Sequence, residues 1–71
     1  MENYNKEKDL KDALDSVNLI NSFEGKQLSD DDRLKISHNV EHLRIIIQRH
    51  GLKEKEASVY SQAISIGEKL L

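Results

Sequence analysis

The chain has 71 residues and no cysteine, proline or tryptophan; 34% of its residues are charged, and its formal net charge is −2. This length allows one domain, and the lack of cysteine excludes disulfides and thiolate metal sites. Because a domain of this size buries only about 60% of its unfolded surface, self-association into a homo-oligomer is also expected.

The composition and charge distribution favour helices that dock within the chain. Leu, Ile, Lys, Glu and Asp dominate, which predicts an all-α fold. Residues 1–32 carry four lysines and nine carboxylates, whereas residues 33–71 carry seven Lys/Arg and four glutamates. We expect this asymmetry to aid internal docking, because nucleic-acid-binding domains usually carry a clear basic excess.

The first ten residues are polar where a secretory signal peptide needs an apolar stretch. The longest run of apolar residues is the triplet Ile45–Ile47, far short of the roughly 18 residues of a membrane span. These features predict a soluble, cytoplasmic protein without a membrane partner.

The first predicted helix runs from Lys6 to Phe23, with Asn5 as its N-cap and residues 1–8 frayed. Gly25 follows at the position where helices commonly end. One face gathers the apolar residues Leu10, Ala13, Leu14, Val17 and Ile20.

A capping signal opens the second predicted helix, Asp30 to Arg49. Ser29 is followed by three aspartates, which satisfy free amide donors and complement the helix dipole. A calcium loop is disfavoured because consecutive carboxylates point in different directions and no central glycine separates them. Gly51 is expected to end this helix. The core stripe consists of Ile36, Val40, Leu43 and Ile47.

The third predicted helix opens between Lys53 and Glu56 and continues to the C-terminus. Its inner face contains Tyr60, Ala63, Ile64, Gly67, Leu70 and Leu71. Ala63 and Gly67 lie four residues apart, so a neighbouring backbone can approach closely there. Because the joint at Gly51 is short, helices two and three should form an antiparallel hairpin, with helix one packed across it as a third helix.

Candidate catalytic and metal-binding residues are few. His38 and His42 share a helix face and could hold a metal with Glu41. However, Asn39 stands where the helix motif of zinc proteases needs a glutamate, so solvated or hydrogen-bonded histidines are favoured. No nucleophile elbow and no phosphate-binding glycine loop is visible, and a helical hairpin offers little concave surface. We therefore expect no enzyme activity, cofactor or metal.

The remaining faces of helix two suggest protein binding. Asn39, His42, Ile46 and His50 flank the core stripe, and Leu34, His38, Glu41, Ile45 and Arg49 lie opposite it. Asn39 and His42 are interpreted as border residues that hydrogen-bond to backbone or water at helix one, or alternatively as residues that face a partner.

Apolar residues outside the core stripes include Leu19, Phe23, Leu34, Ile45, Ile46 and Ile66. This excess favours an interface, because a bundle of this size cannot cover all of them. The predicted partner-binding residues are Leu34, His38, Asn39, His42, Ile45, Ile46 and Arg49.

Two alternatives remain open. Basic residues cluster around the helix joint, namely Arg33, Lys35, Arg44, Arg49, Lys53 and Lys55, and they could contact nucleic-acid phosphates. Interspersed glutamates and the absence of aromatic residues among these bases disfavour this interpretation. The other alternative is a minor structural component of a virion.

The segment Asn39-Val40-Glu41-His42-Leu43, followed twenty residues later by Ala63-Ile64-Ser65-Ile66-Gly67, resembles small uncharacterised proteins encoded by bacteriophages and prophages. The resemblance covers Ser29 to Leu71, with Asn39, His42, Ala63 and Gly67 as shared positions. It implies a phage accessory protein of unknown activity and carries over no catalytic residue. For this chain we expect such a protein to act in the host cytoplasm by binding a host or phage protein, as its regulator or inhibitor.

Overall fold

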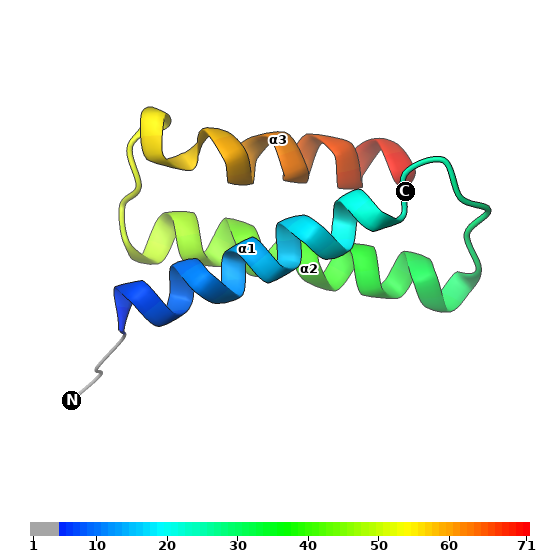
Figure 1. The fold of residues 1–71 in the computed structure, drawn as a ribbon, viewed down its shortest axis with the longest axis horizontal. Helices are drawn as coiled ribbons and strands as arrows, with labels where there is room; N and C mark the ends of the chain where they lie inside the picture. Colours follow the sequence, from blue (N-terminus) through cyan, green and yellow to red (C-terminus); the bar gives the residue numbers. More distant parts are fainter. Residues whose placement is uncertain (1–4) are drawn as a thin grey trace.

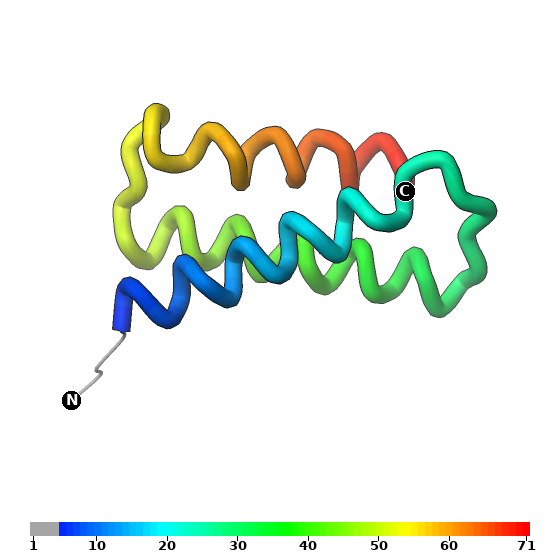
Figure 2. Tube along the Cα trace, in the orientation of Figure 1, coloured from blue at the N-terminus to red at the C-terminus, as the bar shows by residue number. Residues whose placement is uncertain are grey.

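The computed structural model describes residues 5–71 as three helices: α1 (Lys6–Ser22), α2 (Asp30–Arg49) and α3 (Glu54–Leu70). α2 and α3 form an antiparallel hairpin, and α1 crosses the hairpin diagonally, running in the same general direction as α3 (Figures 1 and 2). Each helix packs against both of the others, and the described residues contain no strand. The predicted all-α, three-helix arrangement is therefore confirmed.

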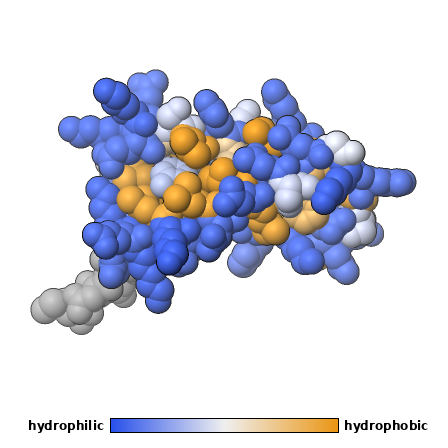
Figure 3. Space-filling view, viewed as in Figure 1, coloured by the Kyte–Doolittle hydropathy of each residue, from blue (hydrophilic) through white to orange (hydrophobic). Residues whose placement is uncertain are grey.

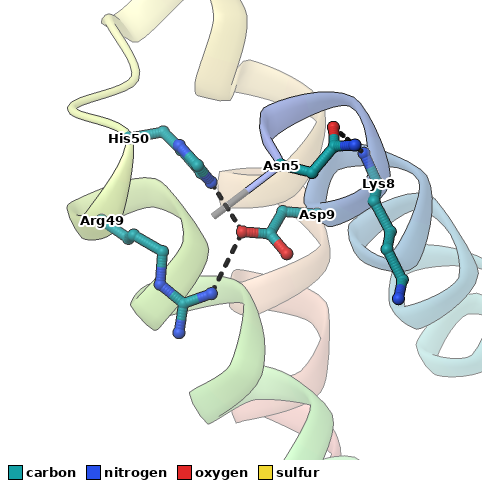
Figure 4. A network of polar contacts seen from close by, with 5 residues as sticks. All are labelled: Asn5, Lys8, Asp9, Arg49 and His50. Carbon is teal, nitrogen blue, oxygen red and sulfur yellow. Dashed lines mark hydrogen bonds and ion pairs between the residues drawn. The ribbon is translucent and has the colours of Figure 1, made fainter. Parts of the chain in front are cut away.

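α1 begins at the predicted residue, because Asn5 caps its first turn. The Lys8 backbone N–H donates to the Asn5 side-chain oxygen at 3.2 Å (Figure 4). The helix ends at Ser22, one residue before the predicted boundary. The expected fraying of residues 1–8 falls partly on residues 1–4, which lie outside the described range.

α2 begins with a reciprocal cap between Ser29 and Asp32. The Asp32 N–H donates to Ser29 Oγ at 3.1 Å, and the Ser29 N–H donates to Asp32 Oδ2 at 3.0 Å. The pair satisfies two backbone donors that a helix start leaves open. The Ser29 N–H also stabilises the ionised carboxylate and so holds the pKa of Asp32 below its usual range.

The chain reverses direction between α2 and α3 within residues 50–53. Gly51 has a φ of +55°, its N–H donates to the Gln48 carbonyl at 3.2 Å, and the Leu52 N–H donates to the Ile47 carbonyl at 3.0 Å. These two bonds satisfy carbonyls that the end of α2 would otherwise leave without a partner. Ile47 and Leu52 both pack against the core, so this joint directs α3 back along α2.

The core lies where all three helices meet, and Ile20, Ile36, Leu43 and Ile46 are its largest fully buried side chains. The smaller or less completely buried core residues are Ala13, Val17, Val40, Ala57, Tyr60 and Ala63. These residues confirm most of each predicted stripe.

Two residues predicted in the core are exposed. Leu14 is 48% exposed because α1 buries a narrower strip than the predicted stripe, centred on Ala13, Val17 and Ile20. Leu71 is 53% exposed because it follows the last residue of α3.

Gly67 packs tightly against side chains of α2. A Cβ atom placed on this buried glycine would lie 2.5 Å from Val40 Cγ2 and 3.4 Å from Ile36 Cγ2. Carbon atoms in van der Waals contact are about 3.5–4.0 Å apart. The predicted tight packing of α2 against α3 at Gly67 is therefore confirmed, although side chains of α2, and not its backbone, fill the space beside the glycine.

Candidate partner-binding surface

Four residues form what we call the α2 outer face: Leu34, His38, Glu41 and Ile45. They recur at steps of four, three and four, on the side of α2 opposite its buried residues. Leu34 is 69% exposed and Ile45 is 43% exposed. His38, Glu41, His42 and Ile45 together line a shallow pocket. The structure thus brings together four of the predicted partner-binding residues, Leu34, His38, His42 and Ile45, on or beside one helix face.

Asn39 has a structural role between α1 and α2. Its side-chain nitrogen donates to the Lys35 carbonyl at 2.7 Å, and its side-chain oxygen accepts from Ser16 Oγ at 2.8 Å. Ser16 is only 4% exposed, and a buried hydroxyl without a partner would destabilise the fold. Of the two interpretations of Asn39, the structure supports the border residue that hydrogen-bonds to helix one.

Arg49 and His50 join the end of α2 to the first turns of α1 through Asp9 (Figure 4). Arg49 donates to Asp9 Oδ2 at 3.0 Å, and His50 Nε2 lies 2.7 Å from the same oxygen. The hydrogen bond from His50, with the Arg49 guanidinium beside it, holds the pKa of Asp9 below its usual range. Arg49 therefore holds two helices together rather than belonging to the α2 outer face.

The expectation that Ile46 is left over at the surface is wrong, because this side chain is 1% exposed. Helix geometry places Ile46 on the same flank of α2 as Asn39 and His50. Both of these residues form hydrogen bonds with α1, so α1 covers Ile46. Phe23 and Ile66 also pack against the core. The surplus of uncovered apolar residues on α2 is thus reduced to Leu34 and Ile45.

Val59 is an exposed apolar residue that sequence reasoning missed. It is 51% exposed on α3. Figure 3 shows apolar surface along the line where α1 crosses the hairpin, between α1 and α3. The position of Val59 outside the predicted α3 stripe was the available signal, since an apolar residue off the buried face of a helix is expected to meet solvent.

All three arginines of the chain already pair with carboxylates. Arg33 lies 3.6 Å from Asp30, Arg49 pairs with Asp9, and Arg44 pairs with Glu68 on α3. The predicted cluster of six basic residues around the helix joint is wrong for Arg33 and Lys35, which lie in the first two turns of α2, at the end far from Gly51. The arginines are instead spread along α2, and each is partly neutralised by the chain itself.

No group of three His, Cys, Asp or Glu side chains within residues 5–71 is placed to hold a metal ion. Over the same part of the chain, none of the helices has both the length and the apolar character needed to cross a membrane. Comparison with protein-family models, with curated proteins and with solved structures found no match to this chain.

Proposed function

We propose that this protein acts by binding another protein through the α2 outer face. The observation that carries the proposal is the exposure of Leu34 and Ile45 on a helix whose other large apolar residues are buried or half-buried. An exposed apolar pair at helical spacing suits a partner that lies along the helix and contacts several successive turns.

Burial provides the driving force. Complete burial of a leucine or isoleucine side chain contributes about 1.5–3 kcal/mol, before the costs of association. Leu34 and Ile45 lie eleven residues apart, about 16 Å along the helix axis, so a partner must span three turns to use both. His38 and Glu41 lie between them and supply polar contacts that can orient the partner.

The resemblance to phage and prophage proteins suggests the biological setting. In that setting the protein acts as an accessory factor in the host cytoplasm, where it regulates or inhibits a host or phage protein. The nucleic-acid alternative has less support, because the arginines are spread along α2 rather than gathered at the joint, and all three already pair with carboxylates. No observation favours the virion-component alternative.

The test is Ile45→Asp, measured by recovery of complexes from the native host and then by direct binding to the purified partner. A carboxylate is tolerated in solvent but costly in an apolar interface, so we expect binding to weaken at least about tenfold, with the melting temperature little changed. Ser37→Asp is the matched control, because Ser37 is also exposed on α2 but lies off the outer face.

The outcomes separate clearly. Partners retained by wild type and Ser37→Asp but lost by Ile45→Asp support the proposal. If every recovered partner binds Ile45→Asp as tightly as wild type, Ile45 is only an exposed isoleucine and the α2 outer face is not the binding surface.

A further inference from the structure

α3 contains the longest stretch of the chain without a charged residue. The eleven residues Ala57–Gly67 carry no Asp, Glu, Lys or Arg, although 34% of the chain is charged. Four of them, Ala57, Tyr60, Ala63 and Gly67, are buried against the other helices. The others include the exposed residues Ser58, Val59, Ser61, Gln62 and Ser65. The exposed surface of α3 is therefore uncharged for about three turns.

Four of these uncharged residues, together with one charged residue at each end of the helix, form what we call the α3 outer face. Its members are Glu54, Ser58, Ser61, Gln62, Ser65 and Lys69. α3 lies along one edge of the molecule (Figure 1), and all six residues are exposed. A shallow depression lined by Glu54, Lys55, Ser58, Ser61, Gln62 and Ser65 runs along it. The short serine side chains leave this depression, and side chains of a second helix can pack into it.

The absence of charge is informative because it removes the main cost of covering a surface. Burying an ionised side chain without a partner is expensive, and the centres of protein interfaces are depleted of charged residues. By contrast, the exposed residues in the middle turns of α1 and α2 include charged side chains, among them Lys11, Asp15, Lys35 and Arg44. Among the three helices, α3 is the one whose middle turns could be covered without desolvating a charge.

The charges at the two ends of this face indicate what covers it. Glu54 lies in the first turn of α3 and Lys69 in its last turn, and neither has an ion-pair partner within residues 5–71. By helix geometry, an arc of about 80° on one side of α3 contains Glu54, Ser58, Ser61, Ser65 and Lys69.

We propose that the α3 outer face binds a second copy of this chain, with the two α3 helices antiparallel about a two-fold axis between Ser61 and Gln62. This axis places Glu54 opposite Lys69 of the second copy, and the symmetry repeats that pair at the other end of the interface. Between the two pairs, Ser58 faces Ser65 and Ser61 faces Gln62. The face is thus complementary to itself in charge.

The neighbouring line on α3 does not share this property. It runs through Lys55, Val59, Gln62, Ile66 and Lys69 at steps of four, three, four and three. Because it has a lysine at each end, antiparallel pairing along it would bring like charges together. The charge pattern therefore selects the α3 outer face.

The test is a charge swap measured by sedimentation equilibrium across a concentration series up to about 1 mM, since an interface of one helix per copy is small and its dimer weak. Glu54→Lys places two lysines together at each end, and Lys69→Glu places two carboxylates together. Two exposed ion pairs are affected by each substitution, so each should weaken the dimer roughly 5- to 30-fold. The double variant Glu54→Lys/Lys69→Glu restores the opposite charges and should recover most of the lost affinity.

Only a contact between chains can produce this recovery. Within one chain Glu54 and Lys69 are fifteen residues apart, about 22 Å along the helix, beyond the screening length of about 10 Å at 0.1 M salt. Melting curves at low protein concentration report any loss of helix stability from reversing charges at the helix ends, separately from dimerisation.

A second pair of variants tests the centre of the interface. Ser61→Glu introduces two carboxylates near the two-fold axis and should abolish the dimer, whereas Ser37→Glu on α2 should leave it intact. Concentration-dependent dimerisation that follows this pattern and recovers in the double swap supports the proposal. A wild-type chain that stays monomeric at about 1 mM overturns it, and so does a dimer that Ser61→Glu leaves intact or a double swap that binds no better than the single variants. None of these measurements depends on the partner proposed for α2.

Discussion

The close approach at Gly67 leads to a prediction in which an ordinarily stabilising substitution destabilises the protein. Alanine in place of glycine inside a helix normally gains about 1 kcal/mol. At position 67, however, the added methyl group would lie 2.5 Å from Val40 Cγ2. We expect Gly67→Ala to lower the free energy of unfolding.

The magnitude follows from what must move to admit the methyl group. Val40 is 4% exposed, and a β-branched side chain in a helix has essentially one favoured χ1 rotamer. Either Val40 leaves that rotamer or α3 moves away from α2. Overpacking of this kind costs about 1–3 kcal/mol, so after the gain in helix propensity the net loss is about 1 kcal/mol and at most about 2 kcal/mol. For a domain of this size, each 1 kcal/mol lowers the melting temperature by about 4–8 °C.

The assay is urea unfolding of the four proteins of a double-mutant cycle: wild type, Gly67→Ala, Val40→Ala and the double variant. Val40→Ala removes the methyl group that causes the clash, so Gly67→Ala in that background should be neutral or should stabilise by up to about 1 kcal/mol. Ser65→Ala, at an exposed position of the same helix, is the control and should stabilise by a few tenths of a kcal/mol.

The decisive observation is that Gly67→Ala lowers the free energy of unfolding in the wild-type background but not in the Val40→Ala background. If Gly67→Ala raises the free energy of unfolding equally in the wild-type and in the Val40→Ala background, there is no steric conflict between positions 67 and 40. The tight packing of α2 against α3 at Gly67 would then be wrong.

Two further predictions concern the polar contacts that position the helices. Because the folded-state pKa of Asp9 is lowered, its stabilising contribution is complete above the ordinary value of about 3.9 and is lost as the pH falls through the lowered value. The urea midpoints of wild type and Asp9→Asn should therefore converge in acid, and a gap of equal size at neutral pH and at about pH 2 would contradict the assigned contacts. Ser29→Ala should lose about 1 kcal/mol through the cap of α2. Ser37→Ala, exposed within the same helix, serves as its control; equal stability of the two variants would show that the cap contributes nothing.

Local signals explain why the helix boundaries could be predicted. Both ends of α2 were placed correctly because Ser29 and Gly51 act within a few residues of themselves through capping bonds. Gly67 was also recognised, since its four-residue spacing from Ala63 puts two small residues on the buried face of one helix.

The errors arose where the result depends on how α1 crosses the hairpin. Helix periodicity shows which side of a helix is apolar but not how wide a strip its neighbours cover. Leu14 was therefore assigned to the core and Ile46 to the surface, and both assignments were wrong.

The polar contacts between helices were only partly predictable. The flank of α2 containing Asn39 and His50 was expected to meet helix one, and it does. Asp9 was not recognised as the residue that binds Arg49 and His50, because it lies about forty positions away and no local pattern distinguishes it from the other carboxylates of α1.

The short joint between α2 and α3 has a consequence for the order in which the molecule assembles. Residues 50–53 join the two helices of the hairpin, whereas the longer segment 23–29 joins α1 to α2, and the contact of Asp9 with His50 spans 41 positions. Because the entropy lost on closing a loop increases with its length, we expect the hairpin to form before α1 docks onto it. Contacts made late in folding mainly lower the unfolding rate. We therefore expect the contacts of Asp9 to determine the unfolding rate of the three-helix bundle. Stopped-flow measurements would show this as faster unfolding of Asp9→Asn with an unchanged folding rate.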